Sequence, residues 1–386
     1  MISSGPQSLL HKTVAEVAAK RPSKERRFHE LAFMSQGLDQ PMNFCSDNVT
    51  GFAPEILQAL ARANQGPAMP YGDDDLTAEV DRRFAELFEH EVAVFLVATG
   101  SSANALALSC LTPPFGAIYA HPAAHVMVDE CGAPEFYSGG AKMVGVPGAH
   151  GKIAAADLDK VLAASGRGVV HHVQAASVSL SQATEAGTIY RPDEIAAIAE
   201  VARRHKLRLH MDGARFANAL VAQNASPAEL TWRAGVDVLS FGASKNGALA
   251  AEAVVFFDKS LAAEMPYRRK RAGHLFSKMR FLAAQFEAYL TDDLWLRHAR
   301  HANAQARRLS EGLAKLPGAR LLHPVEANEI FIALPEPVIV GLEQAGFKFY
   351  RWIEEGPGIL RLVTAFNTDP AHVTEFVKTA EKLGRG

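Results

Sequence analysis

Short apolar runs alternate with amphipathic helical patterns from about residue 90 onward. The runs typical of buried strands are "VAVFLVA" (92–98), "HVMVDE" (125–130), "GVVHHVQAA" (168–176), "LRLHMDGA" (207–214) and "VDVLSFGA" (236–243). Residues 191–206 have helical spacing, with a proline and acidic residues near the start and basic residues near the end, which suits the helix dipole. This alternation predicts βαβ units and an α/β fold with a largely parallel sheet.

The pattern changes after Phe257. Residues 268–316 form a long, nearly proline-free helical stretch, and beyond it come the short strand patterns "NEIFIAL" (328–334) and "ILRLVTAF" (359–366) and a closing helix. We therefore expect an N-terminal arm (1–41), a large domain (42–267), a helical connection (268–316) and a small α+β domain (317–386).

Composition excludes several classes of protein. The 386 residues are 48% hydrophobic and 21% charged with a formal net charge of −2, so no strong field attracts nucleic acid or an acidic membrane. No apolar run approaches the ~20 residues that span a bilayer. The three cysteines have no metal or redox spacing, and the mixed-charge N-terminus is unlike a signal peptide. We expect a cytoplasmic protein that binds neither nucleic acid nor membrane, and we interpret the basic run 268–271 as a helix start or a subunit contact.

The stretch "ATGSSANALAL" (98–108) is the first candidate for chemistry. A strand ends, a Gly-Ser-Ser turn follows and a helix begins, so free backbone N–H groups, the positive end of the helix dipole and two hydroxyls can bind an anion. The alternative is that Ser101 or Ser102 only caps the helix, which is worth about 1 kcal/mol.

The second candidate is "LHMDGARFANAL" (209–220). Asp212 follows a predicted strand, and the carboxyl ends of parallel strands form the edge where α/β sheets bind ligands. Arg215 follows three residues later and could reach the same cleft. The alternative is that Asp212 caps a helix and Arg215 is its ion-pair partner.

The third candidate is Lys245, which stands in a turn of small residues between two apolar runs. A neutral lysine amine is a nucleophile that forms a Schiff base with a carbonyl cofactor. The alternative is an ordinary surface lysine. The three candidates together occur in the order used by pyridoxal phosphate enzymes: a phosphate cup, an acid that keeps the pyridine nitrogen protonated, and a lysine that carries the aldehyde as an imine.

Five stretches resemble the L-threonine aldolases, which belong to the β-eliminating lyase group of fold-type I pyridoxal phosphate enzymes. They are "CSDNVTG" (45–51), "YGDD" (71–74), "TGSSAN" (99–104), "LHMDGAR" (209–215) and "SFGASKNGALAAEAVVFF" (240–257). The resemblance runs from about Phe44 to Phe366, and the "SKNG" turn is similar to the low-specificity and phenylserine-aldolase branch. It implies pyridoxal 5'-phosphate as cofactor and reversible cleavage of threonine, allo-threonine or phenylserine to glycine and an aldehyde. It also implies a homodimer or homotetramer with shared active sites.

The resemblance implies a role for each matching residue. Lys245 would hold the cofactor as an imine, Asp212 would pair with the pyridine nitrogen, and Gly100 and Ser101 would bind the phosphate. His125 would stack on the cofactor ring and help to manage the proton of the β-hydroxyl group.

Four further residues are expected around the substrate and the phosphate. Ser46, Arg215 and Arg361 would hold the substrate carboxylate, a task suited to the planar fork of arginine. Arg280 would reach the cofactor phosphate of a neighbouring subunit.

Many L-threonine aldolases carry a histidine in one loop of the large domain, and this sequence differs from them at that position. In the loop "SQATEAG" (181–187) the matching place holds Glu185, which would act as the base directly or through water. His121 and His125 have the i, i+4 spacing of metal ligands, but no third ligand is evident, so no metal is expected. The alternatives are β-elimination or transamination on the same fold, or a non-catalytic binding protein.

Overall fold

The computed structural model describes residues 42–385, and the N-terminal arm predicted for residues 1–41 lies outside them. Residues 43–386 group into one unit by their contacts. Within residues 42–385, no helix is long and apolar enough to cross a membrane.

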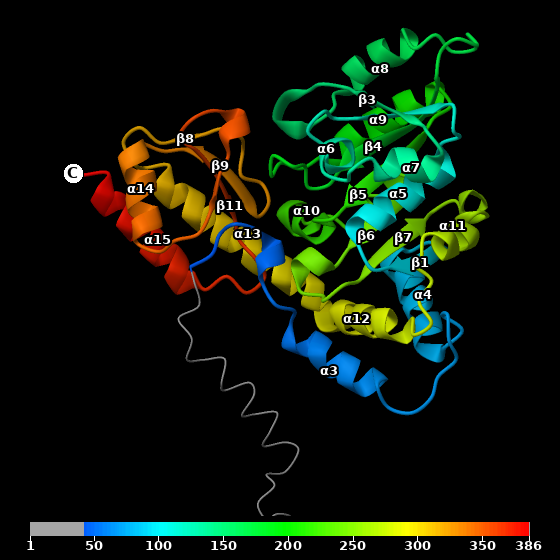
Figure 1. Cartoon of the computed structure of the whole chain (residues 1–386), viewed down its shortest axis with the longest axis horizontal. Helices are drawn as coiled ribbons and strands as arrows, with labels where there is room; N and C mark the ends of the chain where they lie inside the picture. Colours follow the sequence, from blue (N-terminus) through cyan, green and yellow to red (C-terminus); the bar gives the residue numbers. More distant parts are fainter. Residues whose placement is uncertain (1–41, 386) are drawn as a thin grey trace, which may run out of the picture. The chain divides into compact units, whose positions relative to one another are not determined.

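A seven-stranded sheet occupies the middle of the larger part of the chain (Figure 1). Its strands are β1 (Ala93–Val97), β2 (Gly116–Ala120), β3 (Lys142–Gly145), β4 (Gln174–Ser181), β5 (Arg208–Gly213), β6 (Val238–Gly242) and β7 (Glu252–Phe256). The spatial order is β1-β7-β6-β5-β4-β2-β3. β7 runs antiparallel to β1 and β6, and the other neighbouring pairs are parallel. The predicted α/β fold with a mostly parallel sheet is confirmed.

Helices connect and cover these strands. They are α3 (Pro54–Ala63), α4 (Asp75–Phe88), α5 (Gly100–Leu111), α6 (His125–Val128), α7 (Ala133–Ser138), α8 (Ala155–Ala163), α9 (Pro192–Arg204), α10 (Phe216–Gln223) and α11 (Met265–Arg271). α9 is amphipathic and buries one face, whereas α5 is almost entirely buried. An all-round apolar helix of this kind belongs inside a protein, so α5 is a firm base for the turn that precedes it.

Aromatic side chains pack α4 and α12 (Arg280–Leu290) against the sheet. The ring of Phe84 meets Phe241 of β6 at 5.2 Å and Phe286 of α12 at 5.4 Å, both edge to face. Each of these rings is fully buried. Burying one such side chain contributes on the order of 2 kcal/mol, so this cluster holds α4 and α12 against the strand that leads to Lys245.

A second sheet lies near the C-terminus. It has the order β10-β11-β9-β8, all antiparallel, with β8 (Arg320–Leu321), β9 (Glu329–Ala333), β10 (Tyr350–Arg351) and β11 (Ile359–Val363). α14 (Glu336–Gln344) and α15 (Pro370–Leu383) accompany it. α13 (Leu294–Leu313) packs on α10 and also on α15, so one long helix contacts both halves (Figure 1). This agrees with the expected helical connection, and the domain bounds given above stay a prediction.

The segment after residue 42 runs along the small sheet. Phe44 donates its backbone N–H to the carbonyl of Lys348 (2.7 Å), and its own carbonyl accepts from the N–H of Val363 (2.8 Å). The chain then turns at Ser46 into a short 3-10 helix, Asp47–Val49. This path buries Asp47, which pairs with Arg215 at 2.8 Å.

The prediction of a strand at residues 125–130 is wrong. The strand that joins the sheet is β2, which ends at Ala120, and Pro122 follows it without a backbone donor for further pairing. Residues 125–128 instead form α6, in which the Asp129 N–H bonds the His125 carbonyl at 2.9 Å. A short apolar run does not by itself distinguish helix from strand. The run 168–176 contributes only its end, because β4 begins at Gln174.

Candidate active site

A cavity of about 370 Å³ lies where β5 and the β1–α5 and β6–β7 turns converge. Six of the residues singled out from the sequence line it: Gly100, Ser101, His125, Glu185, Asp212 and Lys245. Asn104 and Glu252 line it as well. The structure therefore brings together residues that are up to 145 positions apart in the chain, between Gly100 and Lys245.

The N-terminus of α5 forms one wall. Thr99 is the N-cap, and its Oγ1 accepts from the Ser102 backbone N–H at 3.2 Å. The interpretation that Ser101 or Ser102 caps this helix is therefore wrong. The backbone N–H groups of Gly100 and Ser101 belong to the first turn, where helices lack internal acceptors. A Cβ placed on Gly100 would meet nothing within 4 Å, so this part of the wall is open to a ligand.

Asp212 stands near the carboxyl end of β5 and is buried. Its Oδ1 accepts from the Ala214 N–H (3.0 Å), and its Oδ2 accepts from the Asn104 amide (2.8 Å). The N-cap of α10 is Arg215, which bonds other carboxylates. The interpretation of Asp212 as a helix cap paired with Arg215 is therefore wrong.

Lys245 lies in a 3-10 turn, Ser244–Asn246, between β6 and β7. Two side-chain hydrogen bonds stabilise this turn. The buried Asn246 amide donates to the Tyr289 hydroxyl (2.7 Å) and to the Trp295 carbonyl (2.8 Å). Gly247 has φ 108, and a Cβ there would meet the His298 ring at 2.8 Å, so only glycine fits. The lysine side chain is half-buried and lines the cavity, unlike a freely exposed surface lysine.

Two glutamates line the cavity together with Lys245. Burial raises the pKa of Glu252 to about 7, and its Oε1 accepts from the Ser244 N–H at 3.2 Å. Burial also raises the pKa of Glu185, while the charge of Lys245 acts in the opposite direction. The sequence interpretation missed Glu252, although an acid at the start of the apolar run 252–257 was a signal for it.

His125 belongs to a buried hydrogen-bond network. Its Nδ1 lies 2.9 Å from Oε1 of Glu130, and the same oxygen accepts from the Asn104 amide at 2.8 Å. The Glu130 carboxylate raises the pKa of His125 above its ordinary value, against the opposing effect of burial. Burial raises the pKa of Glu130. The sequence interpretation missed Glu130 and Asn104, although Asn104 stands within the quoted "TGSSAN".

Arg215 and Arg361 meet in an ion cluster beside the cavity. Arg215 binds Asp47 through two nitrogens (2.8 and 3.1 Å) and Glu329 through a third (3.0 Å). Arg361 binds Glu329 at 2.5 Å and donates to the Cys45 carbonyl at 3.3 Å. Ser46 caps the 3-10 helix that carries Asp47 and accepts from the Asn48 N–H at 3.1 Å.

Opposite charges favour the ionised forms of Arg215 and Asp47 in this cluster. Burial opposes the charge on Arg215, but the two carboxylates raise its pKa above the ordinary value. Burial alone would raise the pKa of Asp47, yet Arg215 and Lys245 hold it below its ordinary value. Asp47 and Glu329 were not predicted, because nothing in a linear sequence pairs them with Arg215.

Arg280 lies outside the cavity of its own chain. It begins α12, and its Nη1 donates to the Gly66 carbonyl at 3.1 Å. His121 is also occupied elsewhere, because its Nδ1 accepts from the Ala123 N–H and its Nε2 lies 3.1 Å from the Gly148 carbonyl.

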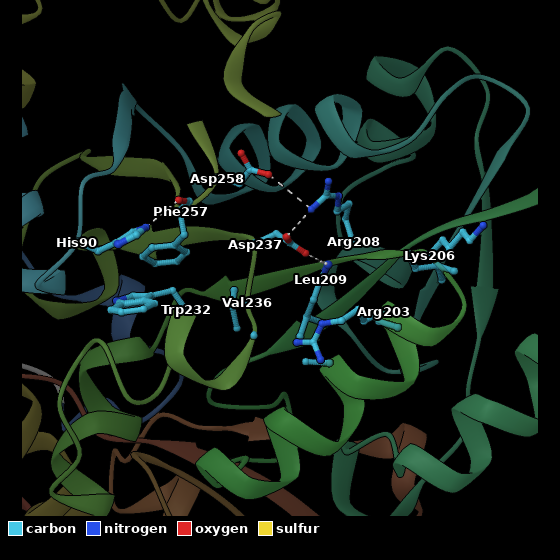
Figure 2. Close-up of a pocket in the computed structure, with 14 residues that line it drawn as sticks. His90, Arg203, Lys206, Arg208, Leu209, Trp232, Val236, Asp237, Phe257 and Asp258 are labelled. Carbon is cyan, nitrogen blue, oxygen red and sulfur yellow. Dashed lines mark hydrogen bonds and ion pairs between the residues drawn. The ribbon is translucent and has the colours of Figure 1, made fainter. Parts of the chain in front are cut away.

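A second cavity, of about 510 Å³, lies at the other ends of the strands (Figure 2). Three of its charged groups bind one another: Arg208, the first residue of β5, lies 3.0 Å from Asp237 and 3.6 Å from Asp258. His90 bonds the Phe257 carbonyl at 3.1 Å. Ligands of parallel sheets bind at the carboxyl ends of the strands, so the cavity at Asp212 is the candidate active site.

Comparison with known proteins identifies the family. The profile of the beta-eliminating lyases matches residues 43–336. The chain belongs to the beta-eliminating lyase family. Among its relatives, a low specificity L-threonine aldolase of Pseudomonas aeruginosa is 46% identical over 340 residues, covering 88% of this chain and 97% of the relative. The predicted resemblance to this family is confirmed.

Two solved structures have folds that superpose on this chain. A Leishmania major threonine aldolase superposes with a TM-score of 0.83 at 30% identity, covering 89% of this chain and 99% of the other. A serine palmitoyltransferase solved with pyridoxal phosphate has a TM-score of 0.64 at 16% identity, covering 89% of this chain and 87% of the other, and shows a shared fold alone.

The cavity of this family member fits pyridoxal phosphate. The open wall at Gly100 leaves space for a phosphate beside free backbone donors. Asp212 offers a buried carboxylate for a pyridinium nitrogen, and Lys245 offers an amine for an aldehyde. The individual roles of these residues stay predictions.

Proposed function

We propose that this chain is a pyridoxal phosphate-dependent aldolase that reversibly cleaves β-hydroxy-α-amino acids. The substrates are threonine, allo-threonine and phenylserine, and the products are glycine and an aldehyde. The observation that carries the proposal is the single cavity shared by Lys245, Asp212, Glu185 and the N-terminus of α5. The L-threonine aldolase names of the relatives support the same reaction.

Each cavity residue has a defined task in this proposal. When bound, pyridoxal phosphate supplies an electron sink for the pair released from the broken Cα–Cβ bond. The Lys245 amine would bind the aldehyde carbon of the cofactor, and Asp212 would hold the proton at the ring nitrogen. The backbone N–H groups of Gly100 and Ser101 would bind the phosphate, and His125 would stack on the ring.

The substrate carboxylate is assigned to Ser46, Arg215 and Arg361. Arg215 is almost fully buried and already binds two carboxylates, whereas 14% of the Arg361 side chain is exposed. Arg361 is therefore the arginine that an entering carboxylate meets first, and Arg215 keeps Asp47 and Glu329 in place. The planar fork of each guanidinium suits a carboxylate.

Proton transfer is assigned to Glu185 and His125. The side chain of Glu185 is half-buried and lines the cavity beside Lys245. Burial raises the pKa of Glu185 above its ordinary value, which makes this carboxylate a stronger base, and it would accept the β-hydroxyl proton directly or through water.

We also propose that the enzyme is a homodimer or homotetramer whose subunits share active sites. Leu249 lines the cavity with 53% of its surface exposed, and in this proposal a second copy would cover that side chain. Arg280 would reach the phosphate of that copy. A cytoplasmic location is proposed as well, and the three cysteines, which are free thiols, suit a reducing compartment.

The test is aldehyde release by the purified full-length protein with cofactor. Rates are measured on the stereoisomers of threonine, allo-threonine and phenylserine, and an absorbance band near about 420 nm reports the lysine-bound cofactor. Lys245→Ala should lose both the band and the activity, since it removes the nucleophilic amine. Lys160→Ala, an exposed lysine on α8, is the control and should keep both.

Two results would overturn the proposal. If the Lys245→Ala protein remained active, Lys245 could not be the residue that holds the cofactor as an imine. Wild-type protein that releases no aldehyde from threonine but passes an amino group to pyruvate would be a transaminase on this fold.

A further inference from the structure

The carboxylate of Glu130 is enclosed at the back of the candidate active site. None of its side chain is exposed, whereas 30% of the His125 side chain is exposed. A single oxygen, Oε1, contacts both Nδ1 of His125 (2.9 Å) and the Asn104 amide (2.8 Å). Glu130 does not line the cavity, so it acts on the cavity only through these two neighbours.

The orientation of the Asn104 amide follows from its surroundings. Its nitrogen lies 2.8 Å from a carboxylate oxygen of Glu130 and also 2.8 Å from one of Asp212. An amide has two N–H donors on the nitrogen, so it can satisfy both acceptors at once, whereas its oxygen would repel them. Asn104 therefore joins the carboxylate behind His125 to the carboxylate at the end of β5.

The same reasoning defines the protonation of His125. An ionised Glu130 carboxylate only accepts hydrogen bonds, so with Glu130 ionised the contact at 2.9 Å places a hydrogen on Nδ1. In the neutral ring the second nitrogen, Nε2, then has a free lone pair. Within residues 42–385, the hydrogen bond of this ring involves Nδ1 and leaves Nε2 for the cavity.

We propose that Glu130 is a positioning residue: it keeps the hydrogen on Nδ1 of His125 and so makes Nε2 the nitrogen that exchanges protons in the cavity. Through Asn104 it also links the orientation of His125 to that of Asp212. The inference rests on the proposed aldolase function for its role in the reaction, but the tautomer itself is independent of that function.

The surrounding charges define the expected titration. Glu130, Asp212 and Glu185 are acids that favour the charged imidazole, and Lys245 opposes it. A hydrogen bond from the ring to a charged carboxylate favours the charged imidazole about ten- to a hundredfold, which is a shift of about one to two pH units. Glu130→Gln removes the charge and keeps the shape, so the His125 titration should move down by about one to two units.

The experiment is histidine NMR on the full-length protein, with and without pyridoxal phosphate. The signal of His125 is assigned as the one lost in His125→Gln. We expect the wild-type ring, when neutral, to carry its hydrogen on Nδ1, and we expect Glu130→Gln to lower its titration midpoint. Asp129→Asn is the matched control, because Asp129 is the exposed neighbour of Glu130 in the chain, and it should leave the midpoint within a few tenths of a unit.

Kinetics add a second readout. Loss of an orienting partner costs activity on the order of ten- to a hundredfold, and we expect the loss in Glu130→Gln to appear in kcat more than in KM. The acidic limb of the kcat/KM profile should move to lower pH together with the NMR midpoint, and Glu130→Asp, which keeps the charge, should recover part of the rate.

Two NMR results would overturn the proposal: a neutral wild-type ring with its hydrogen on Nε2, or an unchanged midpoint in Glu130→Gln. The tautomer of His125 is measured on the wild-type protein, so it tests the proposal even if Glu130→Gln fails to fold. If the protein cleaves no β-hydroxy amino acid yet shows the expected tautomer and midpoint shift, then the aldolase function fails and the positioning by Glu130 stands.

Discussion

Glu252 should make the stability of the protein depend on pH. Its carboxyl group is buried beside the turn of Lys245, and burial raises its pKa from the ordinary 4.5 to about 7. Glu252→Gln removes the ionisation while its amide oxygen still accepts the hydrogen bond from the Ser244 N–H. The substitution therefore separates the effect of the charge from the effect of the shape.

The sign follows from the direction of the shift. The folded protein binds this proton more tightly than the unfolded chain does, so the stabilisation is complete below about pH 4.5 and is lost as the pH rises through about 7. A shift of about 2.5 units corresponds to about 3 kcal/mol at 1.36 kcal/mol per unit. Relative to wild type, the unfolding free energy of Glu252→Gln should rise between pH 5 and 7 by most of this amount and then level off.

The assay is urea unfolding of cofactor-free protein at pH 5, 6, 7 and 8, followed by tryptophan fluorescence. Glu311→Gln, an exposed site on α13, is the matched control and should follow wild type at every pH. Parallel curves for wild type and Glu252→Gln would show that Glu252 is ionised throughout and would refute the reasoning.

Three other substitutions test the neighbouring groups. Asp212→Asn should greatly reduce the rate of threonine cleavage with an unchanged circular dichroism spectrum, and an unchanged rate would leave this residue without a role at the cofactor. Glu185→Gln should keep the cofactor absorbance and lose most aldehyde release, and full activity would exclude it as the base. Asp47→Asn should lower the unfolding free energy by about 3 kcal/mol, because Arg215 loses one of its two buried carboxylates, and an unchanged urea midpoint would contradict this.

The fold was predictable where the local pattern agrees with the tertiary structure. β1, β5 and β6 lie inside the runs that predicted them. β6 is buried at every position, and a strand that is covered on both faces gives a nearly continuous apolar run. The run at 125–130 failed because its apolar residues cover a single turn of α6, which is too short for a helical period to appear.

The site was predictable to the extent that its residues stand in continuous motifs. Lys245 follows β6 and Asp212 stands near the end of β5, so both could be found, whereas Glu130 has significance only through its contacts with His125 and Asn104. Likewise, Asp47 and Glu329 are far from Arg215 in the chain and are brought to it by the fold. A carboxylate whose partner is distant in the sequence has no local signature.

The ion cluster around Arg215 has a consequence for biosynthesis. It joins Asp47, near the start of the described chain, to Glu329 and Arg361, near its end. The ribosome synthesises these residues in that order. Asp47 therefore emerges from the ribosome before Glu329 and Arg361 have been synthesised. The seven-stranded sheet is complete by Phe256, but the ion cluster around Arg215 can form fully only after Arg361 has been synthesised. We expect nascent chains that stop before the small sheet to lack the ability to bind an amino acid.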